Sequence, residues 1–407
     1  MTTDRILIAG GGIGGLATAI GLAQKGLDVL VLEKASQLGE IGAGIQLGPN
    51  AFHAFDYLGV GETARQMAVY IDNLRLMDAL TGVEITRIPL GDAFRARMGN
   101  PYAVVHRGDL HGVFLKACQA HPKVELRTSS GVEGYEQDDT GVRAVLADGS
   151  RVEGRILIGA DGLWSNIRKQ MLQDGPPRVS GHTTYRSVIP TEEMPEDLRW
   201  NAATLWAGPK CHIVHYPLQG WKTFNLVVTY HNDAPEPVAG KPVSRDEVRR
   251  GFEHVAPVAQ QIIDKADDWK LWVLCDRDPV MNWTDGKVAL LGDAAHPMLQ
   301  YFAQGACMAM EDAVSLSHLM GVRGFDGIEQ TLVDYQNSRR LRAARVQLQS
   351  REIGQHVYHP AGAHAELRNA VMSARSPEEW YDQIDWLYGS TGLEGAVSAE
   401  TRKAKKI

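Results

Sequence analysis

Arg5-Ile-Leu-Ile-Ala-Gly-Gly-Gly-Ile-Gly-Gly15 combines a short, strongly apolar run with a dense cluster of glycines. Apolar side chains recur at helical spacing over residues 16–25, and Gly26 follows as a helix-ending glycine. Residues 27–32 then form a second apolar run, which stops at Glu33. The order of strand, glycine turn, helix and strand predicts a βαβ unit and hence a parallel sheet.

The glycine spacing is Gly10-x-Gly12-x-x-Gly15, the fingerprint of a dinucleotide-binding turn when it lies between a strand and a helix. Gly10 allows the tight turn, Gly12 lets the backbone approach a pyrophosphate, and Gly15 lets the helix pack on the strand. Glu33 is placed to accept hydrogen bonds from ribose hydroxyls. A glycine-rich turn that only packs on its own sheet is the weaker alternative, and the motif alone leaves NAD and FAD open.

The composition of the 407-residue chain, with 44% hydrophobic and 22% charged residues, is that of a soluble globular protein of two to three domains. Its formal net charge of −7 excludes the broad basic field that attracts nucleic acid. No run of about 18 uninterrupted apolar residues exists, so no transmembrane segment is predicted. The four cysteines are far apart and are expected to be reduced thiols in the cytoplasm.

Two later apolar runs also end in glycine-containing turns. Residues 155–159 precede Asp161, and residues 287–292 precede Asp293. Three strands of one parallel sheet would bring the three turns together at its carboxyl edge, where α/β folds bind their ligands.

Residues 183–285 have a different pattern, in which polar and apolar side chains alternate. This pattern predicts a mainly antiparallel sheet, with strands at 183–190, 204–216, 222–230 and 269–275. Ser244 and Glu247 have the spacing of a capping box before a helix over residues 248–266. After Ala306 the chain is predicted to be helical, with a long helix over 328–358 and an exposed basic tail at 399–407.

The three turns together resemble those of the group A FAD-dependent aromatic hydroxylases, also called flavoprotein monooxygenases. Gly159-Ala-Asp-Gly-Leu-Trp-Ser-Asn-Ile-Arg168 resembles the second motif of that family, and Gly292-Asp-Ala-Ala-His-Pro297 resembles the third. The resemblance covers residue 1 to about residue 350 and implies non-covalently bound FAD.

By this resemblance, the first motif grips the ADP half of FAD, the second touches both FAD and the nicotinamide nucleotide, and Asp293 holds the ribityl chain. For Arg107 a surface salt bridge is the alternative. Many members carry Gly-Gln-Gly-x-Asn after the third motif, from which Ala303 and Cys307 depart. The cofactor-binding residues implied are Gly10, Gly12, Gly15, Glu33, Lys34, Gly44, Ile45, Arg107, Asp161, Asp293, Gln304, Gly305 and Ala306.

The expected fold class is α/β, with a Rossmann-like FAD-binding domain, a mainly antiparallel substrate domain and a helical C-terminal region. The expected domains are 1–180 and 286–350 for FAD, 181–285 for the substrate, and 351–407 for the helical region. Aromatic residues at 380–388 are expected to pack a terminal helix on the body of the protein. An aromatic patch can also mark a dimer contact, so a homodimer stays open.

The strand Cys211-His-Ile-Val-His-Tyr216 places His212 and Tyr216 on one face and His215 on the other, because side chains alternate along a strand. His212 and Tyr216 are therefore the candidate pair for a small polar aromatic ligand. A structural role for a buried histidine is an equal alternative from this segment alone. A zinc site is less favoured, because His-x-x-His on a strand directs its ligands to opposite faces.

The segments 209–217 and 298–304 resemble those family members that hydroxylate 3-hydroxybenzoate. This resemblance implies that His212, Tyr216 and Gln300 are the catalytic residues, with His212 as base, Gln300 on the phenolic oxygen and Tyr216 on the carboxylate. It also implies NADH as reductant, O2 activation through a flavin C4a-hydroperoxide, and hydroxylation at carbon 6 to give gentisate (2,5-dihydroxybenzoate). No arginine in these segments is placed to hold the carboxylate, and NADPH is the less favoured reductant.

Three alternatives remain open. The same chemistry could act on salicylate or a hydroxypyridine carboxylate. A FAD-dependent reductase or dehydrogenase without oxygen activation belongs to a second class, and a Rossmann-type regulatory protein that keeps a structural flavin belongs to a third.

Overall fold

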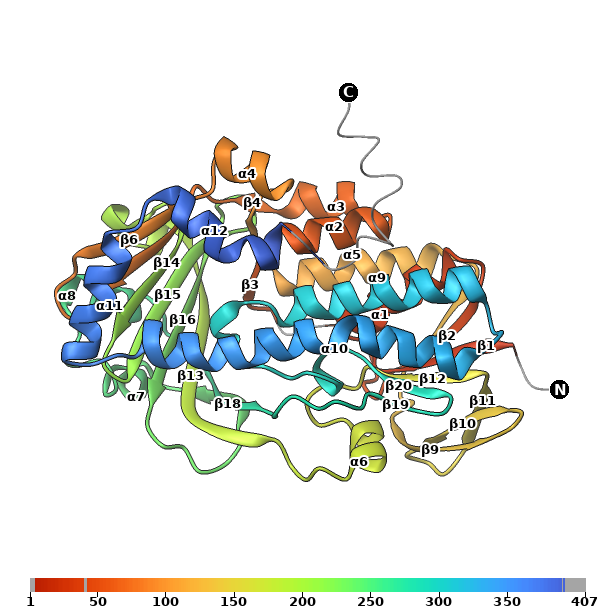
Figure 1. The fold of residues 1–407 in the computed structure, drawn as a ribbon. Helices are drawn as coiled ribbons and strands as arrows, with labels where there is room; N and C mark the ends of the chain where they lie inside the picture. The colour runs from red at the N-terminus through yellow and green to blue at the C-terminus, as the bar shows by residue number, and fades with distance from the viewer. Residues whose placement is uncertain (1–3, 40–41, 390, 392–407) are drawn as a thin grey trace.

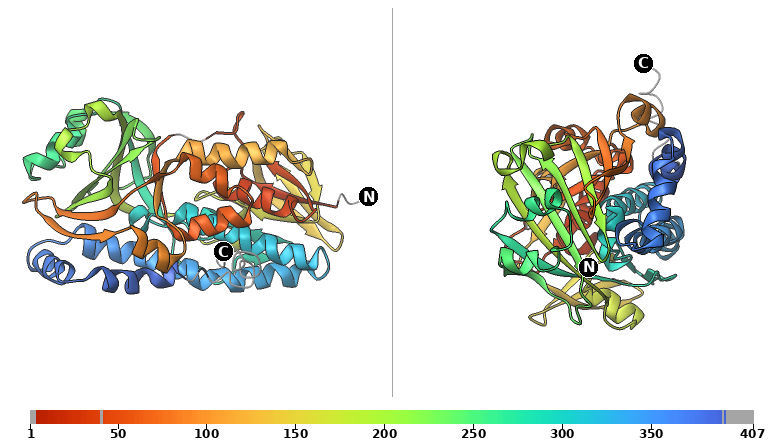
Figure 2. Two further views of the ribbon diagram at one scale, coloured as in Figure 1. Left: turned by 90° about the horizontal axis from the view of Figure 1, so that it is seen from above. Right: turned by 90° about the vertical axis from the view of Figure 1, so that its left-hand side faces the viewer.

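The computed structural model describes residues 4–39, 42–389 and 391. Figure 1 shows an elongated molecule with one large sheet at each end and long helices running between them. The same helices lie along one side of both sheets in the views of Figure 2. The predicted basic tail at 399–407 lies outside the described residues.

A six-stranded, mainly parallel sheet carries the three glycine turns. Its strand order is β19-β20-β12-β1-β2-β8. The central strand β1 pairs in parallel with β12 on one side and β2 on the other, and β12 pairs in parallel with β20. The predicted convergence of three strand ends at one edge is confirmed. The bounds are β1 (Arg5–Ala9), β2 (Asp28–Leu32), β8 (Val124–Arg127), β12 (Ile156–Gly159), β19 (Thr284–Asp285) and β20 (Val288–Leu290).

The helices of this half cover the parallel sheet. Helix α1 contacts both α5 and α9, and a Cβ on Gly21 would lie 2.3 Å from the Ser317 hydroxyl, so α1 and α9 approach closely. The predicted helix after Ala306 is confirmed as α9. The bounds are α1 (Ile13–Ala23), α2 (Pro49–Tyr57), α3 (Gly61–Met67), α5 (Arg107–Ala120), α6 (Asn166–Leu172), α9 (Gly305–Arg323) and α10 (Ile328–Ile353).

An eight-stranded sheet forms the other end of the molecule. Its order is β17-β18-β13-β16-β15-β14-β5-β6, and its neighbours are antiparallel except for the pair β14 and β5. Two of its strands come from within residues 1–180, so this sheet crosses the expected boundary at 181. The bounds are β5 (Asn73–Asp78), β6 (Glu84–Pro89), β13 (Arg178–Pro190), β14 (Ala202–Gly208), β15 (Cys211–Leu218), β16 (Thr223–His231), β17 (Ala239–Val243) and β18 (Trp269–Asp276).

Two local predictions in this half are wrong. The single strand predicted at 204–216 is the hairpin β14–β15, which turns at Pro209 and Lys210, and Lys210 has a φ of 57°. The single helix predicted over 248–266 is two short helices, α7 (Arg245–Arg249) and α8 (Pro257–Ile263). Pro257 begins α8, because proline cannot continue a helix but is favoured in its first turn. The predicted N-cap is confirmed, since the Ser244 hydroxyl accepts from the Glu247 amide at 3.2 Å.

The end of the described chain packs along the body. The helix predicted to reach residue 358 ends as α10 at Ile353 and continues as a single π-helical turn, η5 (Gly354–Tyr358). Helix α11 (Ala363–Ser373) and helix α12 (Pro377–Tyr388) follow. The rings of Tyr381 and Tyr388 pack edge-on against Phe94, so the aromatic residues of α12 serve packing as expected. None of the described helices combines the length and hydropathy needed to cross a bilayer.

Two small sheets and several short helices complete the fold. The α/β class expected from the sequence is confirmed. The remaining bounds are β3 (Gly44–Leu47), β4 (Val69–Tyr70), β7 (Ala103–His106), β9 (Val132–Asp138), β10 (Gly141–Leu146), β11 (Arg151–Gly154), α4 (Asp92–Met98), η1 (Thr191–Glu193), η2 (Glu196–Leu198), η3 (Gly292–Ala294) and η4 (Gln300–Phe302).

Candidate active site

One cavity of about 570 Å³ connects the carboxyl edge of the parallel sheet to one face of the eight-stranded sheet. It brings together every site residue predicted from the sequence except Gly15. The predicted residues that line it are Gly10, Gly12, Glu33, Lys34, Gly44, Ile45, Arg107, Asp161, His212, Tyr216, Asp293, Gln300, Gln304, Gly305 and Ala306.

The first glycine turn has the close contacts that its motif requires. Gly10 has a φ of 107°, and a Cβ there would lie 2.4 Å from the carbonyl oxygen of Ala160. Gly15 lies behind the turn, where a Cβ would lie 2.0 Å from the carbonyl oxygen of Gly10, so Gly15 serves the packing of α1 on β1. The Glu33 carboxylate accepts from the backbone amides of Gly11 at 2.7 Å and Ala35 at 2.8 Å.

The second turn is tied to the third by a buried arginine. The Asp161 carboxylate accepts from the hydroxyl of Ser165, the N-cap residue of α6, at 2.6 Å. Burial raises the pKa of Asp161, although this hydrogen bond opposes the shift. Arg168 donates to the carbonyl oxygens of Ala294 at 3.0 Å and Ala295 at 2.7 Å. The two turns therefore hold each other in place on the same edge of the sheet.

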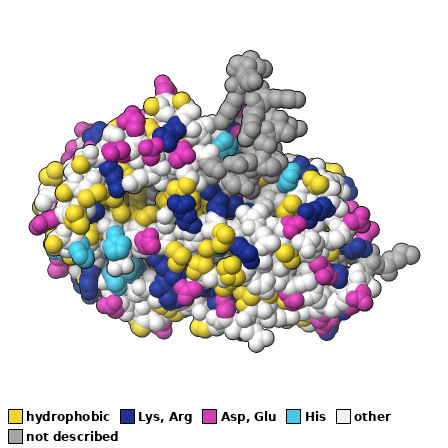
Figure 3. All heavy atoms as spheres, viewed as in Figure 1, with side chains coloured by type: hydrophobic (Ala, Val, Ile, Leu, Met, Phe, Trp, Pro, Cys, Tyr) yellow, Lys and Arg dark blue, Asp and Glu magenta, His cyan; other side chains and the backbone are white. Residues whose placement is uncertain are grey.

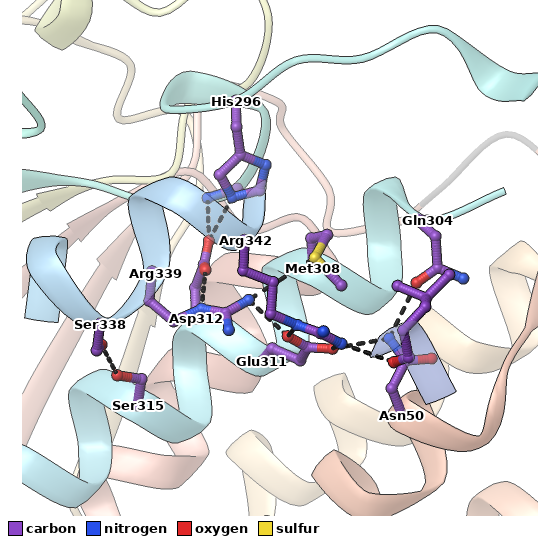
Figure 4. A network of polar contacts seen from close by, with 12 residues as sticks. Asn50, His296, Gln304, Met308, Glu311, Asp312, Ser315, Ser338, Arg339 and Arg342 are labelled. Carbon is purple, nitrogen blue, oxygen red and sulfur yellow. Dashed lines mark hydrogen bonds and ion pairs between the residues drawn. The ribbon is translucent and has the colours of Figure 1, made fainter. Parts of the chain in front are cut away.

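A buried polar network supports the third turn from behind (Figure 4). Asp312 of α9 accepts from the backbone amide of Gly292 at 3.1 Å and contacts the His296 ring at 2.6 Å. Arg339 of α10 pairs with Asp312 at 2.8 Å and with Glu311 at 2.7 Å. Burial alone would raise the pKa of each carboxyl, but the facing cations lower both pKa values below the usual range.

The same network reaches the start of α9 beside the cavity. Asn50 of α2 donates to Glu311 at 2.8 Å and to the side-chain oxygen of Gln304 at 2.9 Å. Arg342 pairs with Glu311 at 2.7 Å and also donates to the backbone carbonyl of Leu387 at the end of α12. The position of Gln304 therefore depends on α2, α9, α10 and α12 together (Figure 4).

The residues of this half fit FAD. The first-turn amides of α1 and of α9 have no intrahelical acceptors and face the cavity, which suits a pyrophosphate and an electron-rich ring. Gly10 and Gly12 line the cavity, so neither position places a side chain between these amides and a phosphate. Within the described residues, no three histidine, cysteine or acidic side chains converge as a metal site.

The other wall of the cavity is one face of the strands β13, β16 and β15. Directly opposed residues share a face of an antiparallel sheet, so the register defines rows of side chains. One row is Thr184, Thr229 and His212, and the next is Arg186, Val227 and Val214. Tyr216 lies in the third row, opposite Asn225, whose side chain accepts from the backbone amide of Gly44 at 2.7 Å. This face of the eight-stranded sheet therefore directly contacts the start of strand β3, which carries Gly44 and Ile45.

The alternation predicted for β15 is seen in the structure. His212 and Tyr216 line the cavity, whereas His215 lies on the opposite face, stacked beside Trp206 in the core. Neither ring nitrogen of His215 has a hydrogen-bond partner in the described part of the chain, and burial lowers the pKa of His215 to about 3.

Arg186 is a cavity residue that the sequence prediction missed. It lies on β13, and it donates to the side-chain oxygen of Gln300 at 2.8 Å. The amide nitrogen of Gln300 donates to the hydroxyls of Thr184 and Thr229, each at 3.2 Å. The Arg186 Nε has no hydrogen-bond partner among the described residues, and burial lowers the pKa of the guanidinium. A cationic group with spare donors therefore lines the cavity. Its signal in the sequence was a basic residue inside an alternating strand.

His212 is almost fully buried at the wall of the cavity. Its Nδ1 lies 2.8 Å from the Nε2 of His359, and its ring packs edge-on against Tyr358 with centroids 4.7 Å apart. Burial lowers the pKa of His212 well below its usual value, and the neighbouring His359 lowers it further. A neutral imidazole at this position can accept a proton. The sequence prediction did not include His359 or Tyr358, which follow the longest helix of the chain.

Comparison with known proteins agrees with this geometry. A family model described as an FAD binding domain matches residues 3–350. The protein 3-hydroxybenzoate 6-hydroxylase 1 of Aquipseudomonas alcaligenes is 54% identical over 391 residues, which are 96% of this chain and 99% of the relative. The 3-hydroxybenzoate 6-hydroxylase of Polaromonas naphthalenivorans is 50% identical over 94% of this chain and 95% of the relative.

Solved structures with the same fold include two with ligands. A salicylate hydroxylase substrate complex has a TM-score of 0.81 and 25% identity, and covers 97% of both chains. Klebsiella pneumoniae HpxO complexed with FAD and uric acid has a TM-score of 0.80 and 26% identity over 94% of this chain and 96% of that chain. The expected flavin cofactor and enzyme class are confirmed. The chain belongs to the family of FAD-dependent aromatic hydroxylases, the group A flavoprotein monooxygenases.

Proposed function

We propose that this protein hydroxylates 3-hydroxybenzoate at carbon 6, para to its hydroxyl group, and so forms 2,5-dihydroxybenzoate (gentisate). The observation that carries the proposal is that one wall of the cofactor cavity carries both a buried neutral base, His212, and a cationic side chain, Arg186. The two relatives named 3-hydroxybenzoate 6-hydroxylase, at 54% and 50% identity, support the choice of substrate.

Arg186 binds the carboxylate of the substrate in this proposal. A guanidinium pairs well with a carboxylate because it offers several donors in one plane. The side-chain oxygen of Gln300 already accepts from one Arg186 nitrogen, which fixes the direction of the guanidinium. In this assignment Arg186 binds the substrate carboxylate, whereas the sequence resemblance implied that Tyr216 does so. Tyr216 instead borders the start of β3, since a Cβ on Gly44 would lie 2.8 Å from the Tyr216 hydroxyl oxygen.

His212 takes the proton of the phenol. The free phenol has a pKa near 10, and its ring is far more nucleophilic as the phenolate, so a base beside it accelerates hydroxylation. The apolar side chains of Val214 and Val227 in the adjacent row exclude water from the ring. When bound, FAD supplies the redox chemistry, taking hydride from the nicotinamide and activating O2.

The reductant we propose is NADH, and the compartment is the cytoplasm. The four cysteines are free thiols in the structure, which agrees with a reducing compartment. A homodimer stays a prediction from the sequence.

The decisive experiment measures O2 and NADH consumption over a panel of hydroxybenzoates, with chromatographic identification of products. We expect 3-hydroxybenzoate to accelerate NADH oxidation and to yield 2,5-dihydroxybenzoate. Faster turnover of salicylate or a hydroxypyridine carboxylate would contradict the substrate, and NADH oxidation without O2 uptake would contradict oxygen chemistry. Equal rates with NADPH would contradict the choice of reductant.

A further inference from the structure

The buried position of His212 raises the question of where its proton goes. An imidazolium in this cavity would be poorly solvated, and no carboxylate of the described residues lies within hydrogen-bond distance of His212. The nearest titratable partner is another imidazole, His359, whose Nε2 lies 2.8 Å from the His212 Nδ1. The two rings are nearly coplanar, with an interplanar angle of 26° and centroids 5.0 Å apart.

We propose that His212 and His359 form a proton relay that carries the phenolic proton from the cavity to solvent. The inference rests on the proposed function and deepens it, because it assigns a second residue to the deprotonation step. His359 does not touch the substrate and acts through His212.

The proton balance of this step is simple. The phenolic O–H bond breaks as its proton binds to His212 Nε2, while the proton on His212 Nδ1 moves to His359 Nε2. The proton on His359 Nδ1 then leaves to water. Both imidazoles end neutral with their tautomers exchanged, so no imidazolium remains in the cavity. The return of a proton along the same path restores the starting tautomers after the product forms.

Beyond His359 the polar groups become progressively more exposed. The His359 ring lies edge-on to His182 with centroids 5.2 Å apart, and His182 lies 4.2 Å from the ring of His231. His231 is one-third exposed and lies 3.3 Å from the carboxylate of Asp233, which is 80% exposed. Figure 3 shows histidine side chains gathered on the surface near the C-terminal end of α10. Water can carry the proton across these ring contacts, because this end of the path is open to solvent.

The backbone holds His359 in place for this purpose. The π-helical turn at the end of α10 displaces the chain, and the His359 amide donates to the carbonyl oxygen of Gly354 at 3.1 Å. A Cβ on Gly354 would lie 2.6 Å from the ring of Tyr301, so the turn packs directly on η4. Single π-helical turns occur often at functional sites. The turn brings His359 to the strand that carries His212.

The groups that face the relay come from five elements. His182 is held by a hydrogen bond between its Nδ1 and the Tyr301 hydroxyl. Burial lowers the pKa of His359 to about 3 and that of His182 to about 4, so each ring transfers protons in its neutral form near neutral pH. The titratable and charged groups around the two rings are Arg178 and His182 on β13, His231 on β16 with the adjacent Asp233, Asp276 on β18, Tyr301 on η4 and Tyr358 on η5.

The test uses the FAD-loaded protein and a pH indicator in a stopped-flow spectrometer. Wild-type protein mixed with 3-hydroxybenzoate at pH 7.5 is expected to release a proton as the phenol ionises. His359→Ala is expected to slow this release by about tenfold or more, because one step of general-base catalysis is removed, with little change in the Kd for the aromatic. The matched control is His356→Ala, an exposed histidine of the same turn, which is expected to release the proton at the wild-type rate.

Added imidazole separates a proton role from a packing role. We expect imidazole to restore a large part of the rate of His359→Ala and to leave the wild type unchanged. Proton release by His359→Ala at the wild-type rate, or a slow variant that imidazole does not accelerate, overturns the relay alone if the wild type still forms product. A wild type that hydroxylates no phenol of the panel overturns the proposed function and the relay together.

Discussion

At the scale of single residues, His212 and His215 lie on opposite faces of β15 and have different surroundings. We expect His212→Ala to keep FAD and to bind the aromatic, but to lower the rate of hydroxylation by about 10² to 10⁴, the usual contribution of a general base. When the phenol ring is not activated, O2 oxidises the reduced flavin without hydroxylating the ring. More hydrogen peroxide per NADH is therefore expected. Coupled assays of NADH, O2 and peroxide measure both effects.

His215→Leu is the control for that substitution. Both ring nitrogens of His215 lack partners among residues 4–39, 42–389 and 391, so replacing the ring by an apolar side chain leaves none of these residues' polar groups without its partner. The yield of dihydroxybenzoate per NADH is expected to stay at the wild-type value. A similar loss of coupling in both variants would contradict the assignment of His212 as the base.

Arg186 provides a second prediction at this scale. Arg186→Met should weaken binding of 3-hydroxybenzoate by about tenfold to a hundredfold, the usual effect of losing a hydrogen bond to a charged group. Binding of 3-hydroxybenzyl alcohol, which has no carboxylate, should change little. Titrations that follow the flavin absorbance give both dissociation constants. If both ligands lose affinity equally, Arg186 supports the pocket without pairing with the carboxylate.

The sequence predicted the face of His212 correctly, because the alternation of side chains along a strand is a local rule. It could not predict His359 as a partner, since 147 positions separate the two residues and only the path of α10 and its terminal turn brings them together. Arg186 was missed for a related reason. Its role depends on Gln300, which lies 114 positions away and reaches β13 from a different half of the fold.

At the scale of elements, the packing of α9 against α10 depends on buried charges. Arg339→Met leaves Glu311 and Asp312 buried with fewer cations, and removing one partner of a buried ion pair typically costs about 3–5 kcal/mol. Urea unfolding is expected to show this loss, together with weaker FAD retention. The control, Arg345→Met, removes an exposed cation stacked on Trp386 and should cost about 1 kcal/mol or less. Equal losses in the two variants would contradict the role given to the network.

The sequence predicted some helices and strands correctly and missed the breaks within others. Strand β1 (Arg5–Ala9) forms from the apolar run that the sequence indicated, because this run ends at an unambiguous glycine cluster. The hairpin β14–β15 was missed, although Gly208-Pro209 is a turn signal, because apolar residues continue on both sides of it. The break between α7 and α8 was missed because the helical spacing of apolar residues over 248–266 indicated one continuous helix. Pro257, which cannot lie inside a regular helix, instead begins α8.

At the scale of the whole molecule, buried histidines couple stability to pH. Burial lowers the pKa of His215 and His359 to about 3 and that of His182 to about 4, whereas all three titrate near 6.5 in the unfolded chain. Below pH 6.5 the unfolded chain therefore binds more protons than the folded protein, and the free energy of unfolding falls as the pH falls.

We expect urea melts of the FAD-loaded protein to show lower stability at pH 5.0 than at pH 7.0. His215→Leu should reduce the difference between the two pH values by about 2 kcal/mol, since 1.5 pH units below 6.5 correspond to this energy for one group. An unchanged difference in His215→Leu would contradict the assignment of His215 as neutral at pH 5.

The order of strands in the parallel sheet has a consequence for biosynthesis. Strand β20 and helix α9 complete the cofactor site, yet they follow the whole eight-stranded sheet in the chain. Until residue 290 has left the ribosome, β12 has no neighbour on one side, and an open strand edge invites wrong pairing. The cofactor site is therefore complete only after α9, which ends at residue 323 of the 407, has been synthesised.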